Sequence, residues 1–500
     1  MERGEQAGSR FRVVEEYPLI EPWAYAQIVE DEVTGERKYI VKEAQLNEEE
    51  GQVYRLLLKI LEWEIRPYDF SVAATTHEAV REYFVTQLKR IVSVYSERLG
   101  ARRKGAIDWQ KVLYHLLRDT VGYGPLEALM KDPYVEDISC DGVGKPLYVW
   151  HQRYEGLPTS IVFGEEEVDS IVLKLAHIAG KHVSVAFPIV DAMLPGGHRL
   201  AATFKREVST SGSTFTIRKF KEKPLSIVDL IIQRSLSADM AAYLWLLMEN
   251  KMPGIVMGVT GSGKTTALNA IATLLKPNLK VVTIEDTPEL RLTLENWVQL
   301  VSRHSYALTG SKTGEVSLFD LVRVSLRYRP DVVIVGEVRG EEAYVLFQAV
   351  ATGHGGLTTI HAENVYALVK RLTSPPMNVP PNYVPLMKWG LLVRRVSVGG
   401  STTRRMTNLW EIGEEEHLLV GEWSPARDEH ELRLQKSRLL EEIGYLTGKE
   451  REELVEEIGR RSEVLRALAA RGVRDYRRVA ETIYRYYNDP KRVLAEMKVA

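Results

Sequence analysis

Cysteine is almost missing from this chain, and neither sign of charge is in excess. Cys140 is the single cysteine among 500 residues, which excludes an intrachain disulfide and a four-thiolate zinc site. Lysine and arginine number 66, against 68 aspartate and glutamate residues, which leaves a formal net charge of −2. This balance provides no broad basic field for binding nucleic acid or an anionic membrane. Because so few thiols are typical of a reducing compartment, we expect a cytoplasmic protein.

Hydrophobic runs of membrane-spanning length are also missing. The longest stretch without a charged residue, 343–362, has about 20 residues but is interrupted by Gly353, Gly355 and Gly356. The N-terminus, Met1-Glu2-Arg3-Gly4-Glu5, leads into mixed charge rather than into the apolar segment of an export signal. We therefore expect no membrane span, so that any contact with a membrane is peripheral.

What the chain does have is enough apolar sequence for large cores, with 45% hydrophobic and 27% charged residues. Composition and periodicity divide it into five segments. These are an N-terminal accessory domain, partly helical (1–107), an α+β second domain (108–220), a charged linker (221–228), an α/β domain (229–415) and a C-terminal helical appendage (416–500). Apolar strands alternate with helices in the fourth segment, and this order is typical of a parallel sheet.

Within these segments, local patterns predict individual elements. Residues 24–29 and 37–41 are predicted as paired strands, and apolar spacing from 48 to 99 is helical. In the C-terminal segment the same spacing predicts helices across 439–446 and 454–468. Asp489 and Pro490 suit the first positions of a last helix.

A phosphate-binding loop stands out in the α/β domain, because Gly258 to Thr266 matches G-x-x-x-x-G-K-[ST] in full. A short apolar strand precedes it and a helix follows it, so its backbone N–H groups and the helix N-terminus are expected to bind phosphates. Lys264 should reach the β- and γ-phosphates, and the Thr265 hydroxyl should bind Mg²⁺. The expected cofactors are ATP and Mg²⁺. The predicted nucleotide-binding residues are Gly258, Thr260, Gly261, Ser262, Gly263, Lys264, Thr265 and Thr266.

Polar residues end three further predicted strands. Glu285-Asp286 follows 280–284, Glu337 follows 331–336, and His361 follows 356–360. Because parallel strands bring their carboxyl ends to one edge of a sheet, we expect these side chains beside the phosphate loop. Asp331 lies at the entering end of its strand and receives no metal role.

The chemistry of phosphoryl transfer assigns these residues their roles. Hydrolysis requires a water in line with the γ-phosphate, and Glu337 is the candidate that orients and polarises it. Glu285 and Asp286 either hold Mg²⁺, Glu285 through a water, or join the surrounding hydrogen-bond network. His361 can donate to the γ-phosphate. His354 fits a structural role in its loop as well as a functional one.

Together these motifs resemble the secretion ATPase superfamily of type II secretion, type IV pilus and archaellum motors. The matching segments are an Asp box (283–289), a Walker B segment (327–339), a His box (352–362) and parts of the second domain (122–127, 188–192, 216–220). The resemblance implies an α/β fold with a RecA-like P-loop ATPase domain, preceded by an α+β domain. It also implies that Arg199 and Arg218 of the second domain act on the nucleotide, in cis or in trans.

The same resemblance implies partners and a branch of the family. Its members are homohexamers that couple ATP hydrolysis to domain motion at the inner face of the membrane, against an integral membrane platform protein. Bacterial members commonly carry a four-cysteine zinc module, which this chain cannot form with Cys140 alone. That absence, a hairpin at 394–412 and the long helical tail are typical of the archaeal branch.

Two functions other than a membrane motor are also consistent with a phosphate-binding loop. A nucleic-acid-translocating ring ATPase, such as a conjugation-type DNA pump or helicase, has support only from the basic clusters 102–104 and 219–223. No basic stripe with interleaved aromatic residues accompanies them, so nucleic acid is not the expected partner. An ATP-gated scaffold without hydrolysis would need a degenerate site, whereas every expected position here is filled.

Overall fold

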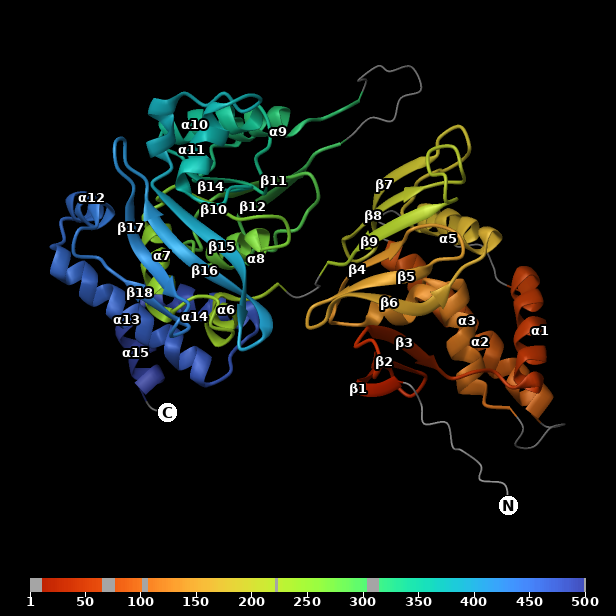
Figure 1. Cartoon of the computed structure of the whole chain (residues 1–500). Coiled ribbons are helices and arrows are strands. Elements are labelled where there is room, and N and C mark those ends of the chain that lie inside the picture. Colours follow the sequence, from red (N-terminus) through yellow and green to blue (C-terminus); the bar gives the residue numbers. More distant parts are fainter. Residues whose placement is uncertain (1–10, 65–76, 101–106, 221–223, 304–313, 499–500) are drawn as a thin grey trace. The chain divides into compact units, whose positions relative to one another are not determined.

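The computed structural model describes residues 11–64, 77–100, 107–220, 224–303 and 314–498, which form two compact units (Figure 1). The first unit is Met1–Glu222 and the second is Lys223–Ala500. Each is built around one nine-stranded sheet. The predicted α/β class is confirmed, whereas the finer division into domains stays a prediction.

The sheet of the first unit has the strand order β1-β2-β3-β6-β5-β4-β9-β8-β7. The strands are β1 (Phe11–Ile20), β2 (Ala24–Asp31), β3 (Arg37–Glu43), β4 (Val135–Cys140), β5 (Pro146–His151), β6 (Glu155–Val162), β7 (Ile189–Leu194), β8 (His198–Thr203) and β9 (Thr214–Arg218). The helices are α1 (Glu48–Glu64), α2 (His77–Gly100), α3 (Trp109–Thr120), the 3₁₀ turn η1 (Gly124–Leu126), α4 (Glu127–Lys131) and α5 (Glu165–Ile178).

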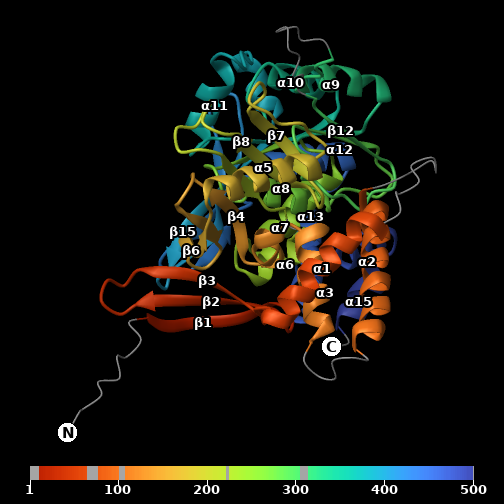
Figure 2. The ribbon, with the colours of Figure 1, turned by 90° about the vertical axis from the view of Figure 1, so that its right-hand side faces the viewer.

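The N-terminal strands continue the sheet of the α+β segment instead of forming a separate element. β1, β2 and β3 make an antiparallel meander, and β3 meets β6 in parallel through the pair Tyr39 and Thr159 (Figure 2). The predicted strands 24–29 and 37–41 are thus confirmed as parts of β2 and β3. Helices α1, α2 and α3 lie side by side and bury a small core of their own (Figure 2). Cys140 is buried in the larger core, and burial raises the pKa of its thiol.

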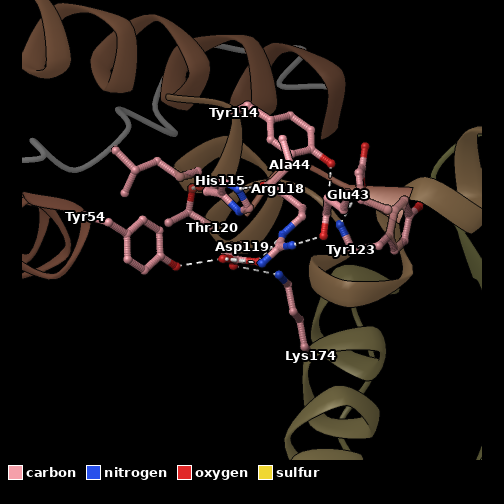
Figure 3. A network of polar contacts seen from close by, with 12 residues as sticks. Glu43, Ala44, Tyr54, Tyr114, His115, Arg118, Asp119, Thr120, Tyr123 and Lys174 are labelled. Carbon is pink, nitrogen blue, oxygen red and sulfur yellow. Dashed lines mark hydrogen bonds and ion pairs between the residues drawn. The ribbon is translucent and has the colours of Figure 1, made fainter. Parts of the chain in front are cut away.

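A polar network joins these helices to the sheet (Figure 3). Arg118 of α3 donates to Glu43 at the end of β3 (Nη1–Oε2, 2.5 Å) and to Asp119 (Nε–Oδ1, 2.8 Å). Tyr54 of α1 donates to the Asp119 carboxylate at 2.7 Å, and Lys174 of α5 donates to the Asp119 carbonyl oxygen at 2.8 Å. Four elements are therefore fixed to one another by hydrogen bonds to charged groups, which are stronger than those between neutral groups.

The sheet of the second unit has the order β12-β11-β13-β14-β10-β15-β16-β17-β18. Its strands are β10 (Gly254–Met257), β11 (Val281–Glu285), β12 (Trp297–Val301), β13 (Val332–Val335), β14 (Gly355–Ile360), β15 (Trp389–Val398), β16 (Ser401–Glu411), β17 (Leu418–Ser424) and β18 (Glu429–Leu432). The first six strands of this order, β12 to β15, are parallel, and β15 to β18 pair antiparallel. The expected parallel sheet is confirmed for its α/β part, and the antiparallel strands extend it.

Helices cover both faces of this sheet. They are α6 (Ile227–Ile232), α7 (Ala238–Glu249), α8 (Lys264–Ala272), α9 (Leu318–Ser325), η2 (Leu326–Tyr328), α10 (Glu342–Ala351), α11 (Val365–Thr373), η3 (Pro381–Leu386), α12 (Arg438–Thr447), α13 (Arg451–Ala470), α14 (Tyr476–Asn488) and α15 (Pro490–Lys498). In β13, Val332 and Ile334 enter the core under α7 and α8, while Val333 and Val335 enter the core under α9, α10 and α11. Alternate residues of one buried strand thus feed two cores, as expected for a doubly covered parallel sheet.

The C-terminal segment differs from the expected helical appendage in two ways. β17 and β18 precede its helices and were not predicted, because both strands are short and the apolar spacing of the residues after them is helical. The predicted helices are confirmed as parts of α12 and α13, and α15 begins at Pro490. Their apolar stripes share one core with α7, since Leu440, Leu465 and Ile483 are buried with Tyr243. The segment is therefore part of the second unit's core.

Glu411 at the end of β16 holds this segment to the sheet. Its buried carboxylate accepts hydrogen bonds from the Tyr243 hydroxyl (2.6 Å), the Ser437 hydroxyl (2.5 Å) and the Arg438 backbone N–H (2.7 Å). Glu411→Ala should therefore lower the free energy of unfolding by about 3 kcal/mol, because buried donors lose their acceptor. Denaturant unfolding measures this loss. Glu442→Ala, which removes a partly exposed ion pair with Lys388, should cost less than about 1 kcal/mol. Equal losses would contradict the anchoring role.

The predicted linker is partly described. Lys221 to Lys223 and the basic cluster 102–104 lie outside the described residues. Lys219, in the basic cluster 219–223 and just before the linker, is bonded to the protein: its Nζ donates to the carbonyl oxygens of Leu129 and Asp132, and burial lowers its pKa to about 8. At the other side α6 begins at Ile227, inside the predicted linker.

The charge-free stretch 343–362 forms most of α10, a turn and β14. Across the described ranges, each helix is too short or too polar to cross a membrane.

Candidate nucleotide-binding site

The phosphate loop lies between β10 and α8, as predicted (Figure 1). All four residues of β10 are buried, and α8 starts at Lys264 directly after the loop. Gly261 and Gly263 adopt φ values of +71° and +100°, in the left-handed region that side chains disfavour. A Cβ built on Gly258 would lie 2.4 Å from Ser262 Oγ and 2.5 Å from Val393 O. The glycines of the motif are therefore required by backbone angle and by space.

Two further features of the loop fit a bound polyphosphate. The hydroxyl of Ser262 is buried, and among the described residues it has no hydrogen-bond partner. The Lys264 ammonium donates to the Val259 carbonyl oxygen at 3.1 Å and is held at the base of the loop. Burial lowers the pKa of Lys264, which is the expected effect of removing an ammonium group from water. The loop N–H groups and the N-terminus of α8 would stabilise the negative charge of a bound anion.

Lys264, His361 and Glu337 lie close together although they come from three different elements. This confirms the expectation that His361 and Glu337 lie beside the phosphate loop at one edge of the sheet. Lys264 Nζ lies 3.3 Å from His361 Nδ1, and His361 Nε2 lies 2.8 Å from Glu337 Oε1. Since an ammonium group can only donate, Nδ1 accepts and the proton of the neutral imidazole is on Nε2. Burial and the charge of Lys264 lower the pKa of His361, which favours this neutral form.

Glu337 is ionised at neutral pH although it is half-buried. Burial alone would raise its pKa, but Arg339 donates to Oε2 at 2.6 Å, and this hydrogen bond and the nearby positive charges lower the pKa overall. A carboxylate with a lowered pKa, next to a lysine and a histidine, can accept a hydrogen bond from a water and orient it. Arg339 was not assigned a role in the sequence, because only the structure reveals its pairing with Glu337.

Glu285 and Asp286 lie at the end of β11 and bond to protein groups. Glu285 is buried and its Oε1 accepts from the backbone N–H groups of Glu289 and Leu290, at 2.8 and 2.9 Å. Its Oε2 accepts from Gln299 at 3.1 Å, and burial raises its pKa. Asp286 accepts from Ser302 at 2.8 Å. These contacts favour the hydrogen-bond network over direct metal binding for Glu285.

Metal binding at this site would depend mainly on groups outside the chain. In the described part of the chain, no three His, Cys, Asp or Glu side chains gather in a metal-binding cluster. Mg²⁺ commonly uses one or two protein ligands together with phosphate oxygens and water, so the single hydroxyl of Thr265 fits this ion.

Asp331 and His354 lie at the opposite end of the strands. Asp331 precedes β13 and accepts from the Lys280 backbone N–H at 2.9 Å. His354 precedes β14, and its Nδ1 lies 3.0 Å from the Ala349 carbonyl oxygen at the end of α10. The placement of Asp331 away from the loop is as expected, and His354 has a structural environment.

Arg199 and Arg218 face each other on neighbouring strands of the first unit, β8 and β9. Both side chains are largely exposed, with Arg199 Nη2 3.0 Å from Asp191 and Arg218 Nε 2.9 Å from Asp137. The structure brings the two guanidinium groups to one surface. Their action on the nucleotide stays a prediction.

A cavity of about 590 Å³ opens on the His361 side of the loop. Its lining residues are Val259, Thr260, His361, Ala362, Glu363, Ala367, Lys370, Arg371 and Ser374. Lys370 and Arg371 of α11 give it a basic wall. Sequence reasoning missed both residues, because a basic pair on an amphipathic helix is usually a solvated face.

Comparison with known proteins gives matches along most of the chain. Residues 124–382, more than half of its length, match the family model "Type II/IV secretion system protein". Residues 430–499 match the model "PilB3-like, C-terminal". An uncharacterized protein of Methanocaldococcus jannaschii, MJ0900, is 37% identical over 479 residues, which cover 90% of this chain and 85% of that protein.

More distant relatives match only part of the chain. Protein VirB11 of Agrobacterium tumefaciens is 26% identical over 276 residues, covering 50% of this chain and 79% of VirB11. The structure of the Legionella pneumophila ATPase DotB is 17% identical with a TM-score of 0.40, covering 73% of this chain and 91% of DotB. The family match over residues 124–382 and the archaeal relative MJ0900 confirm the resemblance, and the chain belongs to the type II/IV secretion system protein family.

Proposed function

We propose that this chain is a motor ATPase that binds ATP with Mg²⁺ and hydrolyses it. The single observation that carries the proposal is the cluster of Lys264, His361 and Glu337 beside the phosphate loop. Membership of a secretion ATPase family supports the same activity. Lys264 is the first residue of α8, and His361 and Glu337 follow β14 and β13. The three groups are therefore brought together by the fold and not by one local motif.

Each residue of the site has a separate role in hydrolysis. The backbone of Gly258 to Gly263 and the ammonium group of Lys264 bind the phosphates, and Thr265 holds the metal. Bound Mg²⁺ neutralises charge that develops on the phosphate oxygens. Glu337 orients and polarises the water, and neutral His361 lies where its Nε2–H can bond Glu337 or the γ-phosphate. Glu285 and Asp286 support the loop after β11.

The first unit contributes to the reaction through its two arginines. Arg199 and Arg218 lie opposite each other, and each pairs with an aspartate. A guanidinium group keeps its charge at any physiological pH and binds phosphate oxygens in pairs, which suits it to neutralise the γ-phosphate. We assign both residues this role, on the nucleotide of the same chain or of a neighbouring copy.

We further propose that the chain works as a homohexamer at the cytoplasmic face of the membrane. Hydrolysis would move the first unit against an integral membrane platform protein and so power filament assembly, archaellum rotation or secretion. Family membership and the PilB3-like C-terminal match support this assignment. A nucleic-acid pump is the second candidate, because a "Putative conjugal transfer protein" of Mycobacterium tuberculosis is 34% identical over half of this chain.

Stimulation of ATP turnover distinguishes the two candidates. The purified full chain should sediment as a hexamer with a non-hydrolysable ATP analogue. Its rate of phosphate release should rise several-fold with vesicles containing anionic lipid and stay unchanged with single- or double-stranded DNA. DNA-stimulated turnover with salt-sensitive DNA binding would overturn the membrane assignment in favour of the pump.

A further inference from the structure

Two arginines of the β15–β16 hairpin lie against the phosphate loop. Arg404 donates to the Gly261 carbonyl oxygen from both Nε and Nη2, each at 3.4 Å. A Cβ built on Gly261 would lie 2.8 Å from Arg395 Nη2, and one built on Gly263 would lie 3.2 Å from Arg404 Cδ. Both guanidinium groups therefore border the backbone that binds phosphate.

The hairpin reaches the loop because of the order of the sheet. β10, which leads into the loop, lies between β14 and β15, and its last residue Met257 is level with Ile360 and Leu392. His361 follows Ile360 on one side of the loop. Arg395 follows Leu392 by three residues on the other side, where it is paired with Arg404.

The two sides of the loop correspond to the two ends of a nucleotide. Lys264 Nζ is directed toward His361, which marks the β14 side as the position of the γ-phosphate. A triphosphate bound along the loop then places its α-phosphate and nucleoside toward β15 and β16. Arg395 and Arg404 are the charged side chains that border the loop glycines there.

The charge arrangement in the hairpin also favours an anion. Arg395 lies opposite Arg404, and Arg394 lies opposite Arg405, so like charges face each other on both faces of the hairpin. Like charges in directly opposed positions destabilise a strand pair. A phosphate oxygen placed beside Arg395 and Arg404 would be attracted to both guanidinium groups.

We propose that Arg395 and Arg404 form a nucleotide subsite that binds the α-phosphate and nucleoside of the chain's own ATP. The proposal rests on the proposed function, since it needs a nucleotide in the phosphate loop. Guanidinium groups bind phosphate oxygens through two parallel N–H bonds and stack on aromatic bases, so the pair suits both parts of this ligand. The subsite distinguishes a nucleotide from a bare polyphosphate.

Binding of two ligands tests the subsite. Calorimetry with a non-hydrolysable ATP analogue and with inorganic pyrophosphate is carried out on the full chain and on Arg395→Ala and Arg404→Ala. Each variant should bind the analogue at least about tenfold more weakly, because a hydrogen bond to a charged group is lost. Pyrophosphate, which can fill the loop without reaching the hairpin, should bind within about twofold of the unmodified chain. Arg404→Lys should recover part of the loss, since it keeps the charge without the planar fork.

A matched control variant distinguishes failure of the arginine subsite from failure of nucleotide binding in the phosphate loop. Arg433 directly follows β18, is exposed and pairs with Glu431 of that strand. Arg433→Ala should change neither the affinity for the analogue nor the affinity for pyrophosphate. Unchanged affinity for the analogue in Arg395→Ala and Arg404→Ala would overturn the subsite. An equal loss for both ligands would also overturn it, because it would mean that the arginines only brace the loop. Failure of the unmodified chain to bind either ligand would overturn the proposed function itself, and the subsite with it.

Discussion

Lys264→Ala is expected to abolish ATP turnover and to weaken ATP binding by about 100-fold, because the loop loses its charged phosphate contact. Lys264 is buried, and its ammonium group lies at the base of the loop, within reach of the Val259 carbonyl oxygen and His361. Phosphate release and calorimetric ATP binding measure the two effects.

The matched control for this variant is Lys276→Ala. Lys276 lies shortly after α8 and pairs with Glu249 at 3.1 Å, outside the residues assigned to the site. It should keep both turnover and affinity, and both variants should unfold at similar temperatures. Turnover at the parent rate in Lys264→Ala would refute the assignment of the phosphate loop.

Glu337→Gln is expected to keep ATP binding and to lower turnover by about 100- to 1,000-fold, the usual contribution of a positioned base. The amide has the shape of the carboxylate but cannot take the proton or polarise the water to the same degree. Because Arg339, His361 and Lys264 lower its pKa, Glu337 is already ionised at neutral pH. Turnover should therefore fall at every pH from 6 to 8, with ATP affinity within about threefold of the parent chain.

Glu341→Gln, four residues away and exposed at the start of α10, is the control for this change. It should hydrolyse ATP at the parent rate. If Glu337→Gln turned over as fast as this control, another group would have to activate the water, and the role of Glu337 would be rejected.

Most of the site could be predicted from the sequence, because its residues follow from local patterns. The phosphate loop has a fixed spacing, and Glu337 and His361 directly follow apolar strands. Since parallel strands share one carboxyl edge, local order was enough to place these residues together. Contacts of Lys264 with His361, and of His361 with Glu337, confirm that reasoning.

Other features could not be predicted, because they depend on pairing between distant segments. Charged residues interrupt the apolar pattern of β1, and β17 is short, so neither strand stands out in the sequence; both form by pairing with β2 and β16. Arg339, Arg395 and Arg404 received no role from the sequence. Only the register of β15 and β16 reveals that two of them border the loop.

The burial of Lys219 also could not be predicted from its neighbours in the sequence. Lys219 belongs to the basic cluster 219–223, yet its ammonium group bonds to two carbonyl oxygens near α4 and its pKa falls to about 8. Burial of a single lysine is decided by residues about ninety positions away, so no local pattern announces it.

ATP hydrolysis at the phosphate loop is measured as the initial rate of phosphate release by the unmodified full chain, with Mg²⁺ present and after its removal by a chelator. We expect steady release with Mg²⁺, loss of release on chelation, and recovery when Mg²⁺ is restored. Binding of ATP by a correctly folded chain without any phosphate release under these conditions would contradict hydrolysis at the phosphate loop.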